Sequence, residues 1–136
     1  MSYIDSWATA YDPEDGDITS SIVTSGVSDV NVNIVGTYYI TYDVMDSSGN
    51  SAPQVTRTIS IVDTTIPEIT LSWLATVDVP IHSSYTDAWA TAEDNYDGDL
   101  TSSIVTSGSV DIDTLGTYYI TYDVTDSNAN DAIQVV

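Results

Sequence analysis

An internal repeat constrains the fold of this chain more than any other feature of its sequence. The segment WATAYDPEDGDITSSIVTSG at 7–26 returns as WATAEDNYDGDLTSSIVTSG at 89–108, an offset of 89 − 7 = 82 residues. A second block, GTYYITYDVMDSSGN at 36–50, returns as GTYYITYDVTDSNAN at 116–130, an offset of 116 − 36 = 80 residues. Similarity at a fixed period of this length indicates consecutive copies of one small domain.

The repeat predicts two domains, each lacking a different end of the repeating unit. We place repeat 1 at 1–62, a linker at 63–66 and repeat 2 at 67–136. Repeat 1 has no counterpart of 67–82, and repeat 2 has no counterpart of 57–66. A sandwich without an edge strand exposes backbone groups and core side chains, so we expect a window on a longer array. The alternative is a subunit whose missing strands come from a neighbour by strand addition.

The residue pattern predicts strands and turns throughout. TYYITYDV, at 37–44 and 117–124, alternates so that Tyr38, Ile40 and Tyr42 share one face. VTRTISIV at 55–62 ends repeat 1, and EITLSWL at 68–74 follows Pro67. Short strands separated by turn residues indicate an all-β fold, which we predict as tandem immunoglobulin-like β-sandwiches truncated at the chain ends.

The residue order YxDxWATAxDxxDGDxTSSIVTSG, then GTYYITYDVxDSSGNSA, then VTRTISIVDTTIPEITL resembles the bacterial immunoglobulin-like repeat of secreted and surface proteins. The family resemblance covers nearly the whole chain and implies an extracellular or surface location, on a cell or a virion. Similar repeats are appended to insecticidal crystal toxins, glycan-degrading enzymes and phage structural proteins, and hyaline repeats are related. Where the family usually has Pro-Gly, this sequence has Ser6-Trp7 and Ala88-Trp89.

The charge balance excludes several classes of partner. One Lys or Arg stands against 21 Asp and Glu, for a formal net charge of -20. Such a surface repels nucleic acids and anionic membranes, so neither is expected as a partner. The sequence contains no run of about 18 apolar residues, so we expect no segment to insert into a membrane. His82 is the only His, Arg57 is the only Lys or Arg, and neither repeat copies a pair of residues that could act as nucleophile and base. We therefore do not expect an enzyme.

Clustered acidic loops predict calcium binding instead. Immunoglobulin-like topology brings the loop after the second strand, the loop before the last strand and the incoming linker to one end of a domain. Oxygen ligands from separate segments are what calcium requires. The predicted ligands of repeat 2 are Asp63, Glu68, Asp94, Asp97, Asp99, Asp126 and Asn130, and those of repeat 1 are Asp12, Asp15, Asp17, Asp46 and Asn50. The alternative is that these Asx turns cap only their own backbone.

Two tryptophans are the candidate partner-binding residues. Trp7 and Trp89 lie on the strand parity opposite the small Ala residues beside them, which predicts that they face outwards if Ala faces the core. Exposed Trp can stack on sugars or anchor a protein partner. The alternative is that each ring folds over its own sheet edge or packs against the linker.

Two functions follow from these features. The first is a non-catalytic structural or adhesive segment, a stalk or spacer whose partners are further repeats of the same chain and whose joint is stiffened by calcium. The second is an accessory module that binds glycan or a neighbouring subunit through its outward Trp residues, for example on a virion surface or filament.

Overall fold

The computed structural model describes residues 2–136 and is all-β. Two compact units divide between Val62 and Asp63, and each is described by itself. Among the described residues, no helix combines the length and the apolar character needed to cross a bilayer. Helical structure in this part of the chain is limited to short 3-10 turns: η1 (Thr19–Ser21), η2 (Val27–Asp29) and η3 (Thr101–Ser103).

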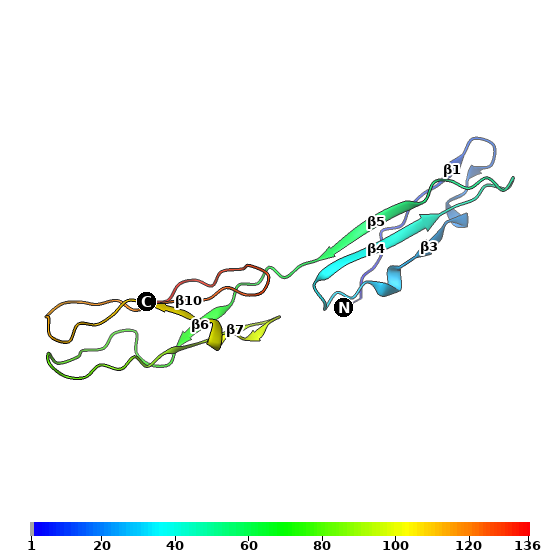
Figure 1. Cartoon of the computed structure of the whole chain (residues 1–136). Coiled ribbons are helices and arrows are strands. Elements are labelled where there is room, and N and C mark those ends of the chain that lie inside the picture. Colours follow the sequence, from blue (N-terminus) through cyan, green and yellow to red (C-terminus); the bar gives the residue numbers. More distant parts are fainter. Residues whose placement is uncertain (1) are drawn as a thin grey trace. The chain divides into compact units, whose positions relative to one another are not determined.

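Repeat 1 is built around a three-stranded antiparallel sheet in the order β3-β4-β5, which Figure 1 shows side by side. Its strands are β1 (Tyr11–Asp12), β2 (Gly16–Asp17), β3 (Val23–Ser25), β4 (Gly36–Asp43) and β5 (Val55–Ile61). The alternation predicted for β4 is confirmed, since Ile40 is fully buried and Tyr39 is 60% exposed. Strand β5 pairs with β4 from Gly36↔Ile61 to Tyr42↔Val55.

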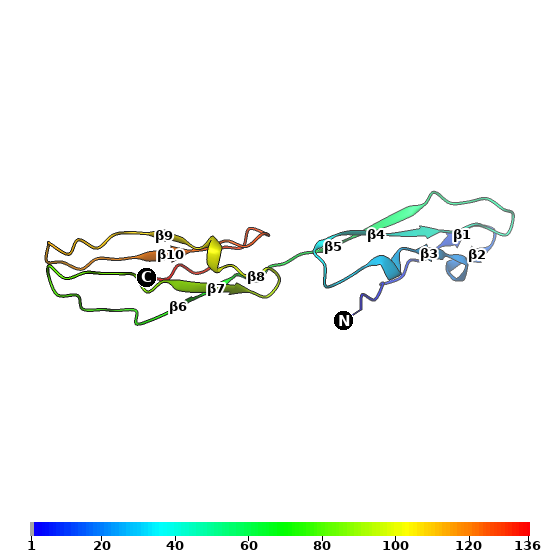
Figure 2. The ribbon, with the colours of Figure 1, turned by 60° about the horizontal axis from the view of Figure 1, so that its bottom comes forward.

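Repeat 2 contains a sheet in the order β6-β7-β8 and a separate pair, β10-β9. Its strands are β6 (Glu68–Leu71), β7 (Ala90–Asp94), β8 (Gly98–Asp99), β9 (Val105–Ser107) and β10 (Thr121–Asp123). Figure 2 shows β9 and β10 lying along one side of this unit and β6 with β7 along the other. Its buried apolar side chains come from both sheets: Ala90, Ala92, Tyr122 and Val124.

The strand predicted at 117–124 is shorter than expected, because regular pairing covers only Thr121–Asp123. The identical sequence in repeat 1 forms eight residues of strand, Gly36–Asp43. The residues of the strand itself therefore do not explain the difference. In repeat 1 the full length of β5 supplies backbone partners, whereas in the described part of repeat 2 the corresponding bridge is Tyr122↔Val135 alone.

Candidate metal site and exposed tryptophans

The turn between β7 and β8 positions the first two carboxylates of the site. The Oδ1 atom of Asp94 accepts hydrogen bonds from the backbone N–H groups of Tyr96, at 2.7 Å, and Asp97, at 3.0 Å. This is an Asx turn, in which a short acidic side chain satisfies the backbone that reverses direction behind it. Gly98, at φ 74, takes the left-handed conformation that completes the turn.

Asp126 belongs to the second loop and is held by that loop's own backbone. Its Oδ1 atom accepts from the N–H groups of Asn128 and Asn130, both at 2.8 Å, and its Oδ2 atom accepts from the Asn130 amide at 2.7 Å. Burial raises the pKa of Asp126, but the hydrogen bonds from Asn130 and Asn128 outweigh it and leave the pKa below its ordinary value. The side chain is therefore a carboxylate at neutral pH.

A serine joins the two loops. Ser127 donates from its backbone N–H to Oδ2 of Asp97, at 2.9 Å, and from its hydroxyl to Oδ1, at 2.7 Å. Because each bond closes 30 residues of chain, this contact fixes the distance between the β7–β8 turn and the loop that contains Asp126. Sequence analysis did not single out Ser127. The available signal was that repeat 1 also has a serine, Ser47, at the equivalent position.

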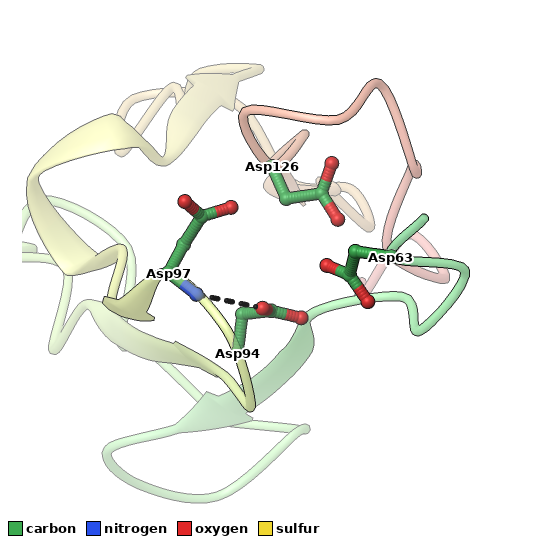
Figure 3. Close-up of side chains that lie close together, drawn as sticks. All are labelled: Asp63, Asp94, Asp97 and Asp126. Carbon is green, nitrogen blue, oxygen red and sulfur yellow. Dashed lines mark hydrogen bonds between the residues drawn. The ribbon is translucent and has the colours of Figure 1, made fainter. Parts of the chain in front are cut away.

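Asp63 brings the third segment to the site. Its Oδ1 atom accepts from the N–H of Thr65 at 3.1 Å, and its backbone carbonyl accepts from the Asn130 amide at 3.4 Å. One oxygen from each of four carboxylates, those of Asp63, Asp94, Asp97 and Asp126, lies within 4.8 Å of the others. Figure 3 shows these side chains pointing into one shared space, and we call them the four-carboxylate group.

Two oxygens of this group have no protein partner. Oδ2 of Asp63 and Oδ2 of Asp94 are buried and accept no hydrogen bond from the described residues. Asp94 is only 9% exposed. An unpaired buried carboxylate oxygen costs substantial free energy unless a cation compensates it. Residues 63–136 contain neither Lys nor Arg, so no such side chain of this unit supplies a compensating charge. The residues present therefore fit a hard divalent cation, which prefers several carboxylate oxygens.

The remaining predicted ligands of repeat 2 occupy other positions. Asn130 contributes through its hydrogen bonds to Asp126 and Asp63, as a neighbour of the four-carboxylate group. Glu68 is exposed at the start of β6, in register with Glu93. The Oδ1 atom of Asp99 accepts from the N–H of Thr101 at 2.9 Å and caps the turn that follows β8.

The predicted ligands of repeat 1 form the same local turns. Asp12 accepts from the N–H groups of Glu14 and Asp15, and Asp15 accepts from Ser47 as Asp97 does from Ser127. Asp46 accepts from the backbone and the amide of Asn50, and Asp17 accepts from the N–H of Thr19. Among the described residues, no repeat 1 group gathers carboxylates as closely as the four-carboxylate group does. No described residue of repeat 1 corresponds to Asp63.

Both candidate tryptophans face outwards. Trp7 is 79% exposed and Trp89 is 61% exposed. Their φ angles are 62° and 64°, in the left-handed region that favours glycine. The family residue that usually stands at this position, glycine, therefore matches the backbone better than tryptophan does. The sequence retains a large apolar side chain here at the cost of backbone strain, in both repeats.

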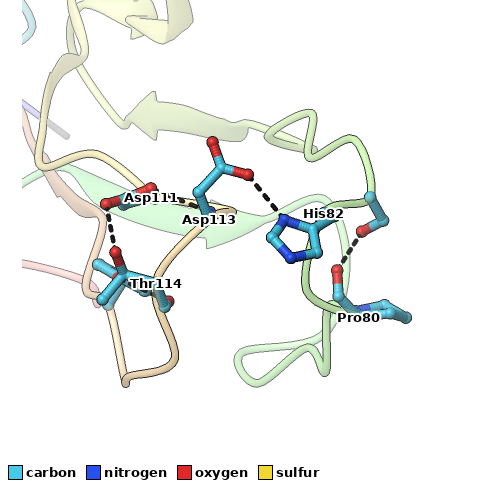
Figure 4. Close-up of polar contacts among 7 residues, drawn as sticks. Pro80, His82, Asp111, Asp113 and Thr114 are labelled. Carbon is cyan, nitrogen blue, oxygen red and sulfur yellow. Dashed lines mark hydrogen bonds and ion pairs between the residues drawn. The ribbon is translucent and has the colours of Figure 1, made fainter.

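The isolated basic residues have structural partners. His82 donates its backbone N–H to the carbonyl of Ile112 at 2.8 Å, and its Nδ1 lies 2.9 Å from Asp113 (Figure 4). Both side chains of that pair are largely exposed. Arg57 pairs with Asp5, which also accepts from the hydroxyl of Tyr42 at 2.8 Å.

The geometry defines a class of protein, antiparallel immunoglobulin-like β-sandwiches with acidic loops. The family described as "Bacterial surface protein, Ig-like domain" matches residues 1–61 and 69–135, and the chain belongs to this family. It is also 33% identical, over 121 residues, to the pesticidal crystal protein Cry22Aa of Bacillus thuringiensis. That match covers 87% of this chain but 16% of the crystal protein. The family resemblance seen in the sequence is thus confirmed, and it indicates a surface or secreted module.

Proposed function

We propose that the chain is a non-catalytic structural segment of an extracellular repeat protein, a spacer or stalk with adhesive use, and that calcium stiffens it where repeat 2 begins. Membership of a bacterial surface family supports the structural role. The observation that carries the calcium proposal is the buried, unpaired Oδ2 of Asp94 within the four-carboxylate group.

The chemistry of the group favours calcium over a tightly hydrated ion. Calcium accepts about six to eight oxygen ligands in flexible geometry, whereas magnesium demands a near-octahedral arrangement and retains water. The four-carboxylate group offers several oxygens from three chain segments, held by turns rather than by a rigid helix. When bound, the ion neutralises carboxylates that otherwise repel one another at short range.

Stiffening follows from the position of Asp63. This residue directly follows Val62, at which the first unit ends. A cation that binds Asp63 together with Asp94 and Asp126 restrains the first residue after the division against the body of repeat 2. Because the ion binds only the assembled group, it stabilises the folded unit by about 2.7 kcal/mol at a concentration 100 times its dissociation constant.

Calorimetry with and without calcium tests the proposal. We expect calcium to raise the melting temperature of repeat 2 well above a sodium control of equal ionic strength. Asp94→Asn keeps a side-chain oxygen for the turn but removes the charge. This variant should therefore melt slightly higher than the parent without ions and should lose the calcium response.

Asp99→Asn is the matched control, because Asp99 was predicted as a ligand yet lies outside the four-carboxylate group. It should retain the calcium response even if its own turn is weakened. Equal responses to calcium and sodium would contradict the proposal, and so would a calcium response that survives Asp94→Asn. Residual dipolar couplings of the two units, measured with and without calcium, would then report whether binding also restricts their relative motion.

The exposed tryptophans favour a second function, an accessory module that holds glycan or a neighbouring subunit. Trp7 and Trp89 are solvent-exposed in both repeats at positions where tryptophan strains the backbone. Large aromatic side chains are enriched at binding hot spots. Retention of the chain on an immobilised glycan panel, compared with a Trp7→Gly and Trp89→Gly double variant, separates this function from a purely structural one.

A further inference from the structure

Strand β4 presents a hydroxyl-bearing surface on the side of its sheet that faces away from the core. Ile40 and Tyr42 are buried, so the alternate residues of the strand lie on the opposite face. The neighbouring strands continue this surface, because the residues in register with Thr37, Tyr39 and Thr41 are all serine or threonine. We call this surface the hydroxyl face, and its members are Ser25, Thr37, Tyr39, Thr41, Thr56, Thr58 and Ser60.

The hydroxyl face surrounds one exposed aromatic ring. Tyr39 is 60% exposed, with Thr37 and Thr41 two residues away along β4 and Thr58 directly opposite on β5. Neighbouring strands lie about 4.8 Å apart, and successive outward residues of one strand lie about 6.7 Å apart. The hydroxyl groups therefore form a regular grid around the tyrosine, over the sheet that Figure 1 shows as β3, β4 and β5.

The hydroxyl face carries no charge, although the formal net charge of the chain is -20. The acid of β4, Asp43, lies at the end of the strand, where its carboxylate accepts from the Gln54 amide at 2.9 and 3.0 Å. By contrast, β6 and β7 of repeat 2 place Glu68 and Glu93 directly opposite one another at exposed positions. Strand preference accounts for threonine on such a surface. It does not account for the exclusion of acids or for an exposed tyrosine.

The β3–β4 part of the hydroxyl face recurs in repeat 2. Ser107 pairs with Thr121 in the register of the corresponding residues of repeat 1. Tyr119, the counterpart of the tyrosine in β4, is 67% exposed. The loop between these strands differs in sequence and length, from VSDVNVNIV at 27–35 to SVDIDTL at 109–115. The exposed tyrosine and hydroxyls are thus the same in both copies, while the connecting loop is not.

We propose that the hydroxyl face binds an extended, neutral polysaccharide. The flat side of a sugar ring presents C–H groups, which pack against the negative face of an aromatic ring such as that of Tyr39. The hydroxyls of Thr41, Thr56 and Thr58 both donate and accept hydrogen bonds, as sugar hydroxyls do. A regular polymer of sugars matches a regular grid of such groups better than a compact ligand does.

Charge favours a neutral glycan over other partners. An acidic polysaccharide is repelled by the net charge of the chain. A basic protein is attracted to the acidic loops, but the hydroxyl face offers it no acid with which to pair. This inference rests on the glycan-binding function proposed above, yet it assigns the binding to a different sheet from the one beside Trp89, which directly precedes β7.

The first test measures retention of the full chain on insoluble polysaccharides. The probes are cellulose, chitin and mannan, which are neutral, and polygalacturonate, which is acidic. We expect retention on at least one neutral polysaccharide and none on polygalacturonate, with no change in high salt, because stacking and neutral hydrogen bonds are not screened. Retention on none of the neutral probes, or retention that high salt abolishes, would overturn the proposal.

Matched variants assign the binding to the hydroxyl face. Tyr39→Ser combined with Tyr119→Ser should weaken binding about fivefold or more, whereas Tyr11→Ser, at a tyrosine on β1 that is 76% exposed, should bind like the parent chain. Thr58→Val keeps the shape of the side chain but removes the hydroxyl, and should weaken binding about threefold. Its control is Thr91→Val, at an exposed position of β7. Equal binding by either variant and its control would overturn the proposal.

The Trp7→Gly and Trp89→Gly double variant, measured on the same probes, separates this site from the tryptophans. If that variant loses retention and the double tyrosine variant keeps it, glycan binding stands and the hydroxyl face is the wrong site. A loss in the tyrosine variant supports the hydroxyl face whatever the tryptophan variant does. If the parent chain instead forms dimers in sedimentation that Tyr39→Ser abolishes, and no polysaccharide retains it, the occupant is a second copy and the proposal is wrong.

Discussion

Two glycines of repeat 1 offer a quantitative test of how β3 meets β4. Gly26 has φ 89°, and a Cβ atom placed on it would lie 2.3 Å from the backbone oxygen of Tyr39. Gly16 has a similar φ of 79°, but a Cβ atom there would meet nothing within 4 Å. The same close approach recurs in repeat 2, between Gly108 and Tyr119 at 2.1 Å. A comparison of alanine substitutions at Gly26 and Gly16 therefore separates the cost of the left-handed backbone conformation from the cost of steric contact.

The substitution Gly16→Ala should cost about 1 kcal/mol of unfolding free energy, because alanine in the left-handed region is strained. Gly26→Ala carries the same cost and must also displace the Tyr39 backbone. That displacement adds about 2 kcal/mol, within the range for strained backbone geometry. Alanine reduces the entropy of the unfolded chain equally in both variants, so this contribution cancels in their difference.

Urea unfolding of both variants, followed by amide exchange of β4, measures the two costs. Exchange assigns the loss to repeat 1, which a probe of the whole chain would not do. We expect Gly26→Ala to be less stable than Gly16→Ala by about 2 kcal/mol. Equal stabilities would show that the β3–β4 junction yields freely, and that the close approach of Gly26 to Tyr39 does not hold these strands in register.

Two further predictions concern the exposed tryptophan and the acidic loop of repeat 2. Trp89→Ala should change the unfolding free energy by less than about 0.5 kcal/mol, because the ring is exposed; a loss of about 3–5 kcal/mol in urea unfolding would show that the ring packs in a core. In calcium-free buffer, the lowered pKa of Asp126 contributes stability above the unfolded pKa, near 3.8, that is lost as pH falls through the folded value. Melting temperatures between pH 6 and 2 should therefore fall less in Asp126→Asn than in the parent chain. An equal fall in both would show that the loop's hydrogen bonds to the Asp126 carboxylate do not contribute to this stability.

The sequence alone was sufficient to establish the repeat, the all-β class and the core face of β4. Period-two alternation is a local property of the backbone, so Ile40 and Tyr42 could be assigned to the interior from their spacing. The acidic turns were equally local, because Asp94 and Asp126 each bind backbone groups within four residues. These features require no knowledge of which segments meet in space.

Tertiary structure decided which of the predicted ligands converge. Asp63 and Asp126 meet across more than sixty residues, and their oxygens are placed by the fold and by the bridge from Ser127 to Asp97. Glu68 and Asp99 carry the same charge, but they lie on strands β6 and β8 and do not belong to the four-carboxylate group. The length of a strand depended on tertiary pairing for the same reason, because the sequence GTYYITYD forms an eight-residue strand in β4 and a three-residue strand in β10.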